Sequence, residues 1–386
     1  MHLFGLIAGL LCIFLWFYLL LAHGRFWMLD RLGAEKAGLS AIPGPIAVVI
    51  PARDEADVVG EAMHSLLQQS CASAIHIFLV DDGSTDGTVE VAREAALHSH
   101  SPQALTVICG QPLPNGWTGK LWAVQQGIDR ALQLHPQFLL LTDADIKHAP
   151  ENVATLVTVA ERGGYDLASF MVKLHCRSLP EKLLIPAFVF FFFMLYPPEW
   201  IRNRRRKVAG AAGGCMLVRP EALERAGGVA VIPGEIIDDC ALARMVKRSG
   251  GKAWLGLTSD TYSLRAYKSF GEIERMIART AFNQLQHSAW LLLGAAAGLL
   301  LMYLLPLALL FTGSLALTLI GAIAYLLMWV IYLPMVRYYG LNAGWALTLP
   351  FSAVFYLVAT IHSALNFWSG RGGEWKGRAQ DSGRPK

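Results

Sequence analysis

Long apolar stretches without charged residues restrict this chain more than any other feature of its sequence. Leu3 to Ala22 contains no charged residue, and about twenty apolar residues let a helix cross roughly 30 Å of hydrocarbon. Ala289 to Met335 is also uncharged and is long enough for two such helices, with a turn near residues 312–314. Because a backbone in lipid must satisfy its own hydrogen bonds, we expect transmembrane α-helices in both regions.

The first stretch is predicted to be a membrane anchor over residues 1–24. Its nearest basic residues, Arg25 and Arg31, follow the apolar core. A cleaved secretory signal has its basic residues before the core. Since basic residues favour the cytoplasmic side of a membrane, the chain after His23 is expected in the cytoplasm.

The end of the predicted membrane region at residues 289–367 leaves the side of the C-terminal tail open. Its last segment, Trp345 to Phe367, is interrupted by Pro350. Three complete spans would place the tail at 368–386 outside, whereas the basic residues of that tail favour the cytoplasm. A re-entrant or interfacial segment broken at Pro350 would reconcile these two arguments.

A shorter apolar segment lies in the middle of the chain. Leu183 to Pro198 contains three prolines and four consecutive phenylalanines, and the basic run Arg202 to Lys207 follows it. It is short for a membrane span. We expect residues 183–207 to lie at the membrane interface, with the basic run against anionic headgroups. The alternative is a buried core helix followed by a solvated loop.

The chain between the membrane regions, residues 41–288, has the composition of a globular domain. Apolar residues make up 54% of the whole chain, against about 45–50% in soluble proteins, and the excess lies in the segments above. Short apolar runs, such as Ile46 to Ile50 and Phe138 to Leu141, alternate with helical patterns. This alternation predicts an α/β fold with a mostly parallel sheet and helices on both faces. Ligands of such sheets bind at the carboxyl ends of the strands.

Acidic residues follow two of the predicted strands in the first half of this domain. Asp81 and Asp82 follow a strand in F-L-V-D-D-G-S-T-D-G-T, and adjacent acids there suit hydrogen bonds from a nucleobase or ribose. A capped turn would explain Asp86 and the glycines but not both of these acids. Residues 50–55 end the first strand, and helix capping is the simpler explanation for the acids Asp54 and Glu55.

Two more acidic pairs follow. Asp143 and Asp145 form a D-x-D after a strand and point to one side of an extended segment. Two such oxygen ligands suit Mg²⁺ or Mn²⁺ carrying a diphosphate. Asp238 and Asp239 precede a predicted helix at residues 240–248. They either stabilise the helix dipole or supply a general base.

Several other functions are excluded by missing motifs. Residues 115–120 resemble a P-loop, but Pro114 and Leu121 stand where that motif needs Gly and Ser or Thr. The first strand–helix turn lacks the glycines of a dinucleotide-binding fold. The six cysteines have no C-x-x-C spacing, which argues against a zinc site. The net charge of +4 gives no reason to expect nucleic acid as a partner.

The motifs V-I-P-A-R-D-E, V-D-D-G-S-T-D-G-T, D-A-D and the acidic pair before a helix, in this order, resemble family 2 glycosyltransferases with the GT-A fold over residues 44–256. G-W-T-G-K-L-W-A at 116–123 and E-W-K-G-R at 374–378 resemble, more narrowly, the hopanoid-biosynthesis-associated glycosyltransferases of bacteria. The resemblance implies a nucleotide-diphosphate-sugar donor, most often UDP-linked, and a divalent cation, Mn²⁺ or Mg²⁺. It also implies a bacterial cytoplasmic (inner) membrane protein whose catalytic domain faces the cytoplasm.

The resemblance assigns roles to individual positions. Asp145 would hold the metal ion, and Asp239 would be the general base, with Asp238 where the family has Glu. Asp143 would lie near the ribose or uracil, and Lys120 near the base or diphosphate. The remaining donor contacts would line the nucleoside pocket: Pro51, Asp54 or Glu55, and Asp81 with its neighbour Asp82.

The expected reaction is a single inverting displacement that moves one sugar to a lipid. The base removes the proton of the acceptor hydroxyl while its oxygen attacks the anomeric carbon. Processive synthases carry Q-x-x-R-W, of which residues 276–280 keep only Arg279. The flanking membrane segments favour a lipid acceptor, and the narrower resemblance suggests a hopanoid. The alternatives are a polyprenyl-phosphate or polysaccharide glycosyltransferase, a nucleotidyltransferase, or a non-catalytic membrane scaffold with a degenerate GT-A domain.

Overall fold

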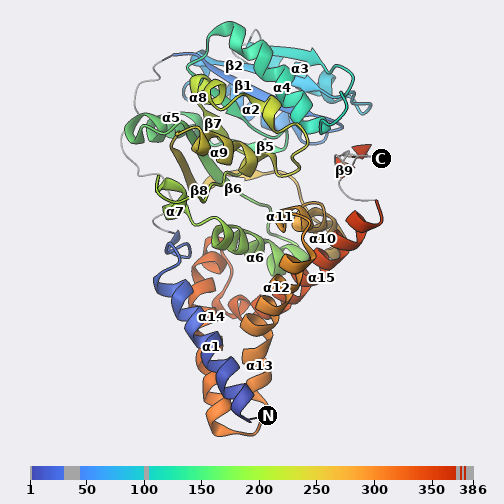
Figure 1. Cartoon of the computed structure of the whole chain (residues 1–386). Helices are drawn as coiled ribbons and strands as arrows, with labels where there is room; N and C mark the ends of the chain where they lie inside the picture. Colours follow the sequence, from blue (N-terminus) through green and yellow to red (C-terminus); the bar gives the residue numbers. More distant parts are fainter. Residues whose placement is uncertain (1, 30–43, 100–103, 371–373, 376–377, 380–386) are drawn as a thin grey trace. The chain divides into compact units, whose positions relative to one another are not determined.

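The computed structural model describes residues 2–29, 44–99, 104–370, 374–375 and 378–379. Arg31 and most of the basic C-terminal tail, including part of the E-W-K-G-R motif, lie outside the described residues. The chain forms two compact units (Figure 1): residues 1–31, 176–199 and 267–372 make the first, and residues 32–175, 200–266 and 373–386 make the second. Residues 176–199 and 267–288, which we expected within the globular domain, therefore group with the apolar helices.

The second unit is built on an eight-stranded mixed sheet in the order β3-β2-β1-β4-β7-β6-β8-β5. β7 is antiparallel to both of its neighbours, and β5 is antiparallel to β8, whereas the other pairs are parallel. The strands are β1 (Ile46–Ala52), β2 (Ile75–Asp81), β3 (Leu105–Cys109), β4 (Phe138–Leu141), β5 (Ile146–Lys147), β6 (Leu167–Lys173), β7 (Met216–Val218) and β8 (Ala253–Ser263).

Helices cover both faces of this sheet because its central strands are apolar on both sides. Val48 and Ile50 pack in a core with α2 (Val59–Leu67), α3 (Thr88–Leu97) and α5 (Asn152–Gly163). Val49 lies on the opposite face, where α4 (Gly119–Ala131) approaches so closely that a Cβ at Gly127 would lie 2.4 Å from Val49 Cγ1. The expected α/β fold with helices on both faces is confirmed.

The described part of this unit also contains α8 (Pro220–Arg225) and α9 (Asp238–Arg248). Helix α9 has two aspartates in its first turn and two basic residues in its last turn, the arrangement that the helix dipole favours. Its buried face includes Leu242 and Val246. This packing places the first turn of α9 at the edge of the sheet where β1 and β4 end.

The described residues include five helical segments that are long and apolar enough to cross a membrane: His2–Leu21, Leu179–Arg202, Ala289–Leu310, Leu315–Tyr338 and Ala343–Trp368. All lie in the first unit except the last three residues of Leu179–Arg202, which belong to the second. The five segments contain α1 (His2–Leu21), α6 (Leu179–Leu195) with α7 (Pro198–Arg202), α12 (Ala289–Leu299) with α13 (Leu305–Leu310), α14 (Leu315–Tyr338) and α15 (Leu349–Trp368). Two shorter helices, α10 (Phe270–Ala278) and α11 (Ala281–Gln284), also belong to the first unit.

Close packing joins α1 to the neighbouring apolar helices. A Cβ at Gly9 would lie 2.5 Å from Ile320 Cγ2, so only a small residue allows this approach, as is usual between membrane helices. Pro306 has no N–H to offer the carbonyl of Met302 four residues earlier. The Trp16 indole N–H donates to that carbonyl at 3.1 Å, which gives it a partner that Pro306 cannot supply.

The expected break at Pro350 is wrong, and Pro186 does not interrupt its helix. Pro350 does not break the last segment, because it lies in the first turn of α15, where its missing N–H is not needed, and α15 continues to Trp368. Pro186 lies inside α6, which continues without a break from Leu179 to Leu195. The start of α6 is fixed by a capping box between Ser178 and Glu181, and this adds a turn before the apolar run.

Candidate functional site

A pocket lies where β1 and β4 end and where α4 and α9 begin. Polar or charged atoms come from Lys120, Thr142, Asp143 and Asp238, and the Gly213 backbone forms part of the wall. The apolar lining comes from Pro51, Leu121, Val124, Leu141, Met216, Val229, Ile232 and Leu242. The pocket therefore combines charged and apolar side chains, and it lies at the sheet edge where ligands of α/β folds bind.

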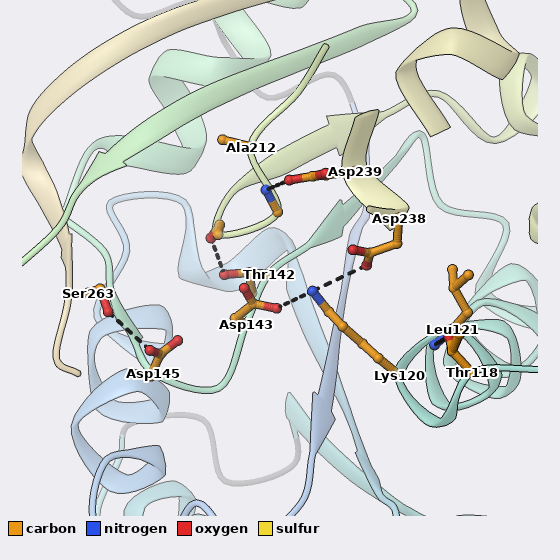
Figure 2. A network of polar contacts seen from close by, with 12 residues as sticks. Thr118, Lys120, Leu121, Thr142, Asp143, Asp145, Ala212, Asp238, Asp239 and Ser263 are labelled. Atoms are coloured by element: carbon orange, nitrogen blue, oxygen red, sulfur yellow. Dashed lines mark hydrogen bonds and ion pairs between the residues drawn. The ribbon is translucent and has the colours of Figure 1, made fainter. Parts of the chain in front are cut away.

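Lys120 is the central cation of this pocket. Its ammonium group lies 2.9 Å from Asp143 Oδ1 and 3.2 Å from Asp238 Oδ2, as Figure 2 shows. Burial lowers the pKa of Lys120, but the two carboxylates raise it by more, so the pKa lies above its ordinary value. Lys120 is therefore charged at any physiological pH, and it joins the D-x-D motif to the acidic pair of α9.

Asp239 lies beside this ion-paired group and is held by backbone N–H groups. Its Oδ2 accepts from Gly213 N at 2.9 Å, and its Oδ1 accepts from Cys240 N at 2.6 Å. Burial and the neighbouring Asp238 raise the pKa of Asp239 to about 6, against the lowering effect of Lys120 and the two N–H groups. A carboxylate with this pKa is ionised at neutral pH and still accepts a proton readily, which suits a general base.

Asp145 lies apart from Lys120, in a second polar group. Its Oδ2 accepts from Ser263 Oγ at 3.0 Å and from Arg265 Nε at 3.2 Å. Arg265 also donates to both carboxylate oxygens of Glu55, at 2.9 and 2.7 Å. Burial and the nearby Asp143 raise the pKa of Asp145, although Arg265 and Ser263 oppose the shift.

The acids after β1 and β2 form a third group, which ties two loops together. Asp54, with a left-handed φ of 49°, accepts from Thr85 N at 2.9 Å. Asp81 accepts from Ser84 N at 3.1 Å, and the buried Asp82 forms an ion pair with Arg53 at 3.4 Å. Within the structure these acids hold turns, and Asp54 and Asp81 remain half-buried. Pro51, near the end of β1, lines the pocket.

The residues of this site offer few oxygen ligands for a divalent cation. These residues therefore fit such an ion only if most of its ligands come from groups other than the protein. The described residues contain no group of three or more His, Cys, Asp or Glu side chains that could hold a metal ion. Asp145 offers a carboxylate, with Asp143 two residues away. One or two carboxylates are what a Mg²⁺ ion bound with substrate phosphates usually takes from a protein. The residues present therefore fit an ion that arrives with a diphosphate.

Two parts of this site were not predicted from the sequence. Arg265 follows the long strand β8, and nothing in its local sequence links it to Glu55 or Asp145, both more than a hundred residues earlier. The segment A-G-A-A-G-G-C at residues 209–215 supplies the N–H that holds Asp239. Its run of small residues was a usable signal, since such segments often allow a close approach of the backbone.

A family profile described as glycosyl transferase family 2 matches residues 47–227. This range covers β1 to α8 and includes the D-x-D motif, but it ends before Asp238 and Asp239. Among solved structures, a mannosyltransferase, PcManGT from Pyrobaculum calidifontis in complex with GDP-Man and Mn²⁺, has the same fold. It has a TM-score of 0.53 and 19% sequence identity, and the comparison covers 93% of this chain and 98% of that one.

Two curated relatives have informative names. The chain is 30% identical over 125 residues to an undecaprenyl-phosphate 4-deoxy-4-formamido-L-arabinose transferase of Pseudomonas savastanoi, which is 32% of this chain and 34% of that protein. It is 32% identical over 101 residues to a 4,4'-diaponeurosporenoate glycosyltransferase of Staphylococcus aureus, which is 26% of this chain and 24% of that protein. The chain spans about half or less of the length of the curated relatives it matches.

Proposed function

We propose that the glycosyl transferase family 2 domain at residues 47–227, together with α9, transfers one sugar from a nucleotide-diphosphate-sugar to a lipid. The observation that carries this proposal is the group formed by Lys120, Asp143, Asp238 and Asp239. It places a carboxylate with a pKa near 6 at the ligand-binding edge of the sheet. A base of that strength is what the deprotonation of an acceptor hydroxyl requires at neutral pH.

Asp239 acts as the base in this proposal, and Asp238 helps to set its strength. Asp239 takes the proton of the acceptor hydroxyl at a carboxylate oxygen while the acceptor oxygen attacks the anomeric carbon. Attack from the face opposite to the leaving group inverts the configuration of the sugar. Burial partly shields the Asp239 carboxylate from water, and the Gly213 N–H fixes the orientation of this carboxylate.

We assign the binding of the nucleotide-sugar donor to the other acidic residues and to two basic side chains, Lys120 and Arg265. Asp143 and Lys120 would contact the ribose, base or diphosphate, while Asp145 would hold a divalent cation, Mn²⁺ or Mg²⁺. That cation supplies Lewis-acid stabilisation of negative charge on the leaving diphosphate when it is bound. Arg265, which is half-exposed beside Asp145, adds a further positive charge. The nucleoside, UDP-linked by family resemblance, is assigned to Pro51 and the loop acids Asp54, Glu55, Asp81 and Asp82.

The acceptor is proposed to be a lipid because the chain carries a unit of five apolar segments. A hopanoid alcohol is the acceptor that the narrower family resemblance suggests. A polyprenyl phosphate is the second candidate, and it is supported by the relative named for undecaprenyl phosphate. The proposed location is the bacterial cytoplasmic membrane, with the catalytic domain in the cytoplasm, because Arg25 follows the first apolar helix.

The proposal is tested by release of nucleoside diphosphate from detergent-purified protein. UDP-sugars and GDP-sugars are offered with Mn²⁺ and either a hopanoid alcohol, undecaprenyl phosphate or no lipid. We expect release that requires one lipid and one nucleotide, stops on addition of EDTA, and yields a glycosylated lipid in mass spectrometry. Absence of release with every donor, from protein shown to be folded, would favour the scaffold alternative, and pyrophosphate release would favour a nucleotidyltransferase.

The basic loop at residues 202–207 is proposed to contact anionic lipid headgroups. Residues 204–207 are exposed, and the loop is held in place by Lys247, whose ammonium group donates to the carbonyls of Trp200, Ile201 and Val208 at 3.1, 2.7 and 2.7 Å. A fixed, exposed group of basic side chains attracts anionic lipids by about 1 kcal/mol per residue.

Replacing Arg205 and Lys207 by Gln should therefore weaken the preference for anionic lipid by about tenfold or more. Native mass spectrometry of protein equilibrated with phosphatidylglycerol and phosphatidylcholine measures this preference. The matched control replaces Arg93 and Arg130, which are exposed on α3 and α4, and should leave it unchanged. Equal retention of phosphatidylglycerol by both variants would contradict the assignment.

A further inference from the structure

A buried chain of hydrogen bonds leads from α5 to the segment that holds Asp239. The amide of Asn152 donates to His148 Nδ1 at 3.0 Å, and His148 Nε2 lies 3.0 Å from Thr142 Oγ1. The Thr142 hydroxyl donates to the carbonyl of Gly214 at 2.7 Å, a contact drawn in Figure 2. The three side chains are at most 4% exposed, so each contact replaces a hydrogen bond that water cannot supply.

The direction of these bonds fixes the state of the imidazole. Because the Asn152 amide donates to Nδ1, the ring proton must be on Nε2, which donates to Thr142. The Thr142 hydroxyl accepts this bond and donates its own proton onward. Burial lowers the pKa of His148 to about 3, so the ring stays neutral. The hydrogen bonds therefore all run in one direction, from Asn152 through His148 and Thr142 to the Gly214 carbonyl.

The base is contacted by the Ala212–Gly213 peptide, two peptide units before the one that carries this carbonyl. Gly213 N donates to Asp239 Oδ2 at 2.9 Å. One residue earlier, Ala212 N donates to Ser169 Oγ at 2.9 Å, which holds the segment from the side of β6. Two side chains therefore position the Gly213 N–H: Ser169 contacts the residue before Gly213, and Thr142 contacts the residue after it.

We propose that Thr142 and His148 are positioning residues: they hold the Gly213–Gly214 backbone so that its N–H keeps the Asp239 carboxylate in its reactive orientation. This inference rests on the proposed role of Asp239 as the base. Thr142 directly precedes Asp143 in the chain, and its hydroxyl contacts the segment that holds the base.

A measurable consequence is a change in the acidity of Asp239. The charged groups that face it are Asp238 on its own helix and Lys120 on α4, which is itself paired with Asp143. The N–H of Gly213 lowers the pKa of Asp239. When Thr142 no longer holds the Gly214 carbonyl, this N–H moves off the carboxylate, and burial and Asp238 then raise the pKa further.

The test compares Thr142→Val, which keeps the shape but removes the hydroxyl, with Thr142→Ser, which keeps the hydroxyl. Infrared difference titration of each protein against its Asp239→Asn counterpart reports the Asp239 carboxyl without any substrate. Loss of a hydrogen bond to a charged group corresponds to roughly one pH unit. We expect Thr142→Val to move the midpoint upward by about one unit from the value near 6, and Thr142→Ser to leave it in place.

Activity supplies the second readout. In Thr142→Val the acid limb of the kcat profile should move with the midpoint, whereas KM for the donor should change little. His148→Gln, which can still donate to Thr142, should lie between Thr142→Val and wild type, and it serves as the test protein if Thr142→Val does not fold.

Two outcomes separate this inference from the function on which it rests. An unchanged titration midpoint in folded Thr142→Val would overturn the positioning role. Full transfer activity in Asp239→Asn would instead overturn the proposed base, and the substrate-free titration would still decide whether Thr142 controls that carboxyl.

Discussion

Replacement of Asp239 by Asn should lower kcat for sugar transfer by about 10²–10⁴-fold, the usual contribution of a general base. The amide keeps the size of the side chain and can still accept from the Gly213 N–H, but it cannot take the proton of the acceptor hydroxyl. Donor binding should be nearly unchanged, because the charged groups assigned to the donor, Lys120, Asp143 and Asp145, remain. Initial rates at saturating donor, with the donor Kd from calorimetry, measure the two quantities separately.

Asp238→Asn is the matched control for this prediction. Asp238 raises the pKa of Asp239, so its neutralisation should lower that pKa and move the acid limb of the pH profile to lower pH. A rate at neutral pH within about tenfold of wild type would fit a role in tuning the base. If Asp238→Asn lost its activity while Asp239→Asn kept the wild-type rate, the two residues would have to exchange roles.

The pH profile of the unmodified enzyme follows from the same carboxyl. Only the ionised form of Asp239 accepts a proton, and its pKa is raised to about 6. The kcat should therefore fall as the pH is lowered through that value. An ordinary Asp, with a pKa near 4, would keep its rate about two units further into acid.

The fold was predictable where the pattern is local. Val48 and Val49 are both apolar because the two faces of β1 are covered, and this run alone indicates a buried strand. Asp143 and Asp145 were expected at the ligand-binding edge because they follow another such strand, and Asp143 lines the pocket. The order of the remaining strands could not be predicted in this way, because the antiparallel insertion of β7 between β4 and β6 depends on contacts far apart in the sequence.

The parts of the site that sequence reasoning missed are also non-local. Lys120 pairs with Asp143 and also with Asp238, which lies more than a hundred positions away in the sequence. Arg265 pairs with Glu55 and Asp145 across still longer separations. Motif order identified most of the acids, but it contains no distances. It therefore could not show that Lys120 and Arg265 divide these acids into two separate ion-paired groups.

Lys120→Met should reduce kcat/KM by about 10²-fold, because it leaves Asp143, Asp238 and Asp239 close together without their shared cation. Two effects combine: the site loses affinity for an anionic diphosphate, and the pKa of Asp239 rises because Lys120 no longer lowers it. The sign of the second effect is diagnostic. A higher pKa leaves Asp239 protonated at neutral pH, so part of the lost kcat should return as the pH is raised. The same titration should restore nothing in Asp239→Asn.

Lys147→Met is the matched control for Lys120→Met. Lys147 also forms an ion pair, at 2.6 Å from Glu61, but both side chains are well exposed, and such surface pairs contribute about 0–1 kcal/mol. We expect its kinetic constants to equal those of wild type. If Lys120→Met lost activity equally at every pH, Lys120 would act on the donor alone; if it kept the wild-type rate, the ion-paired group would have no role in transfer. Recovery at alkaline pH would show that one lysine both binds the donor and keeps the base ionised.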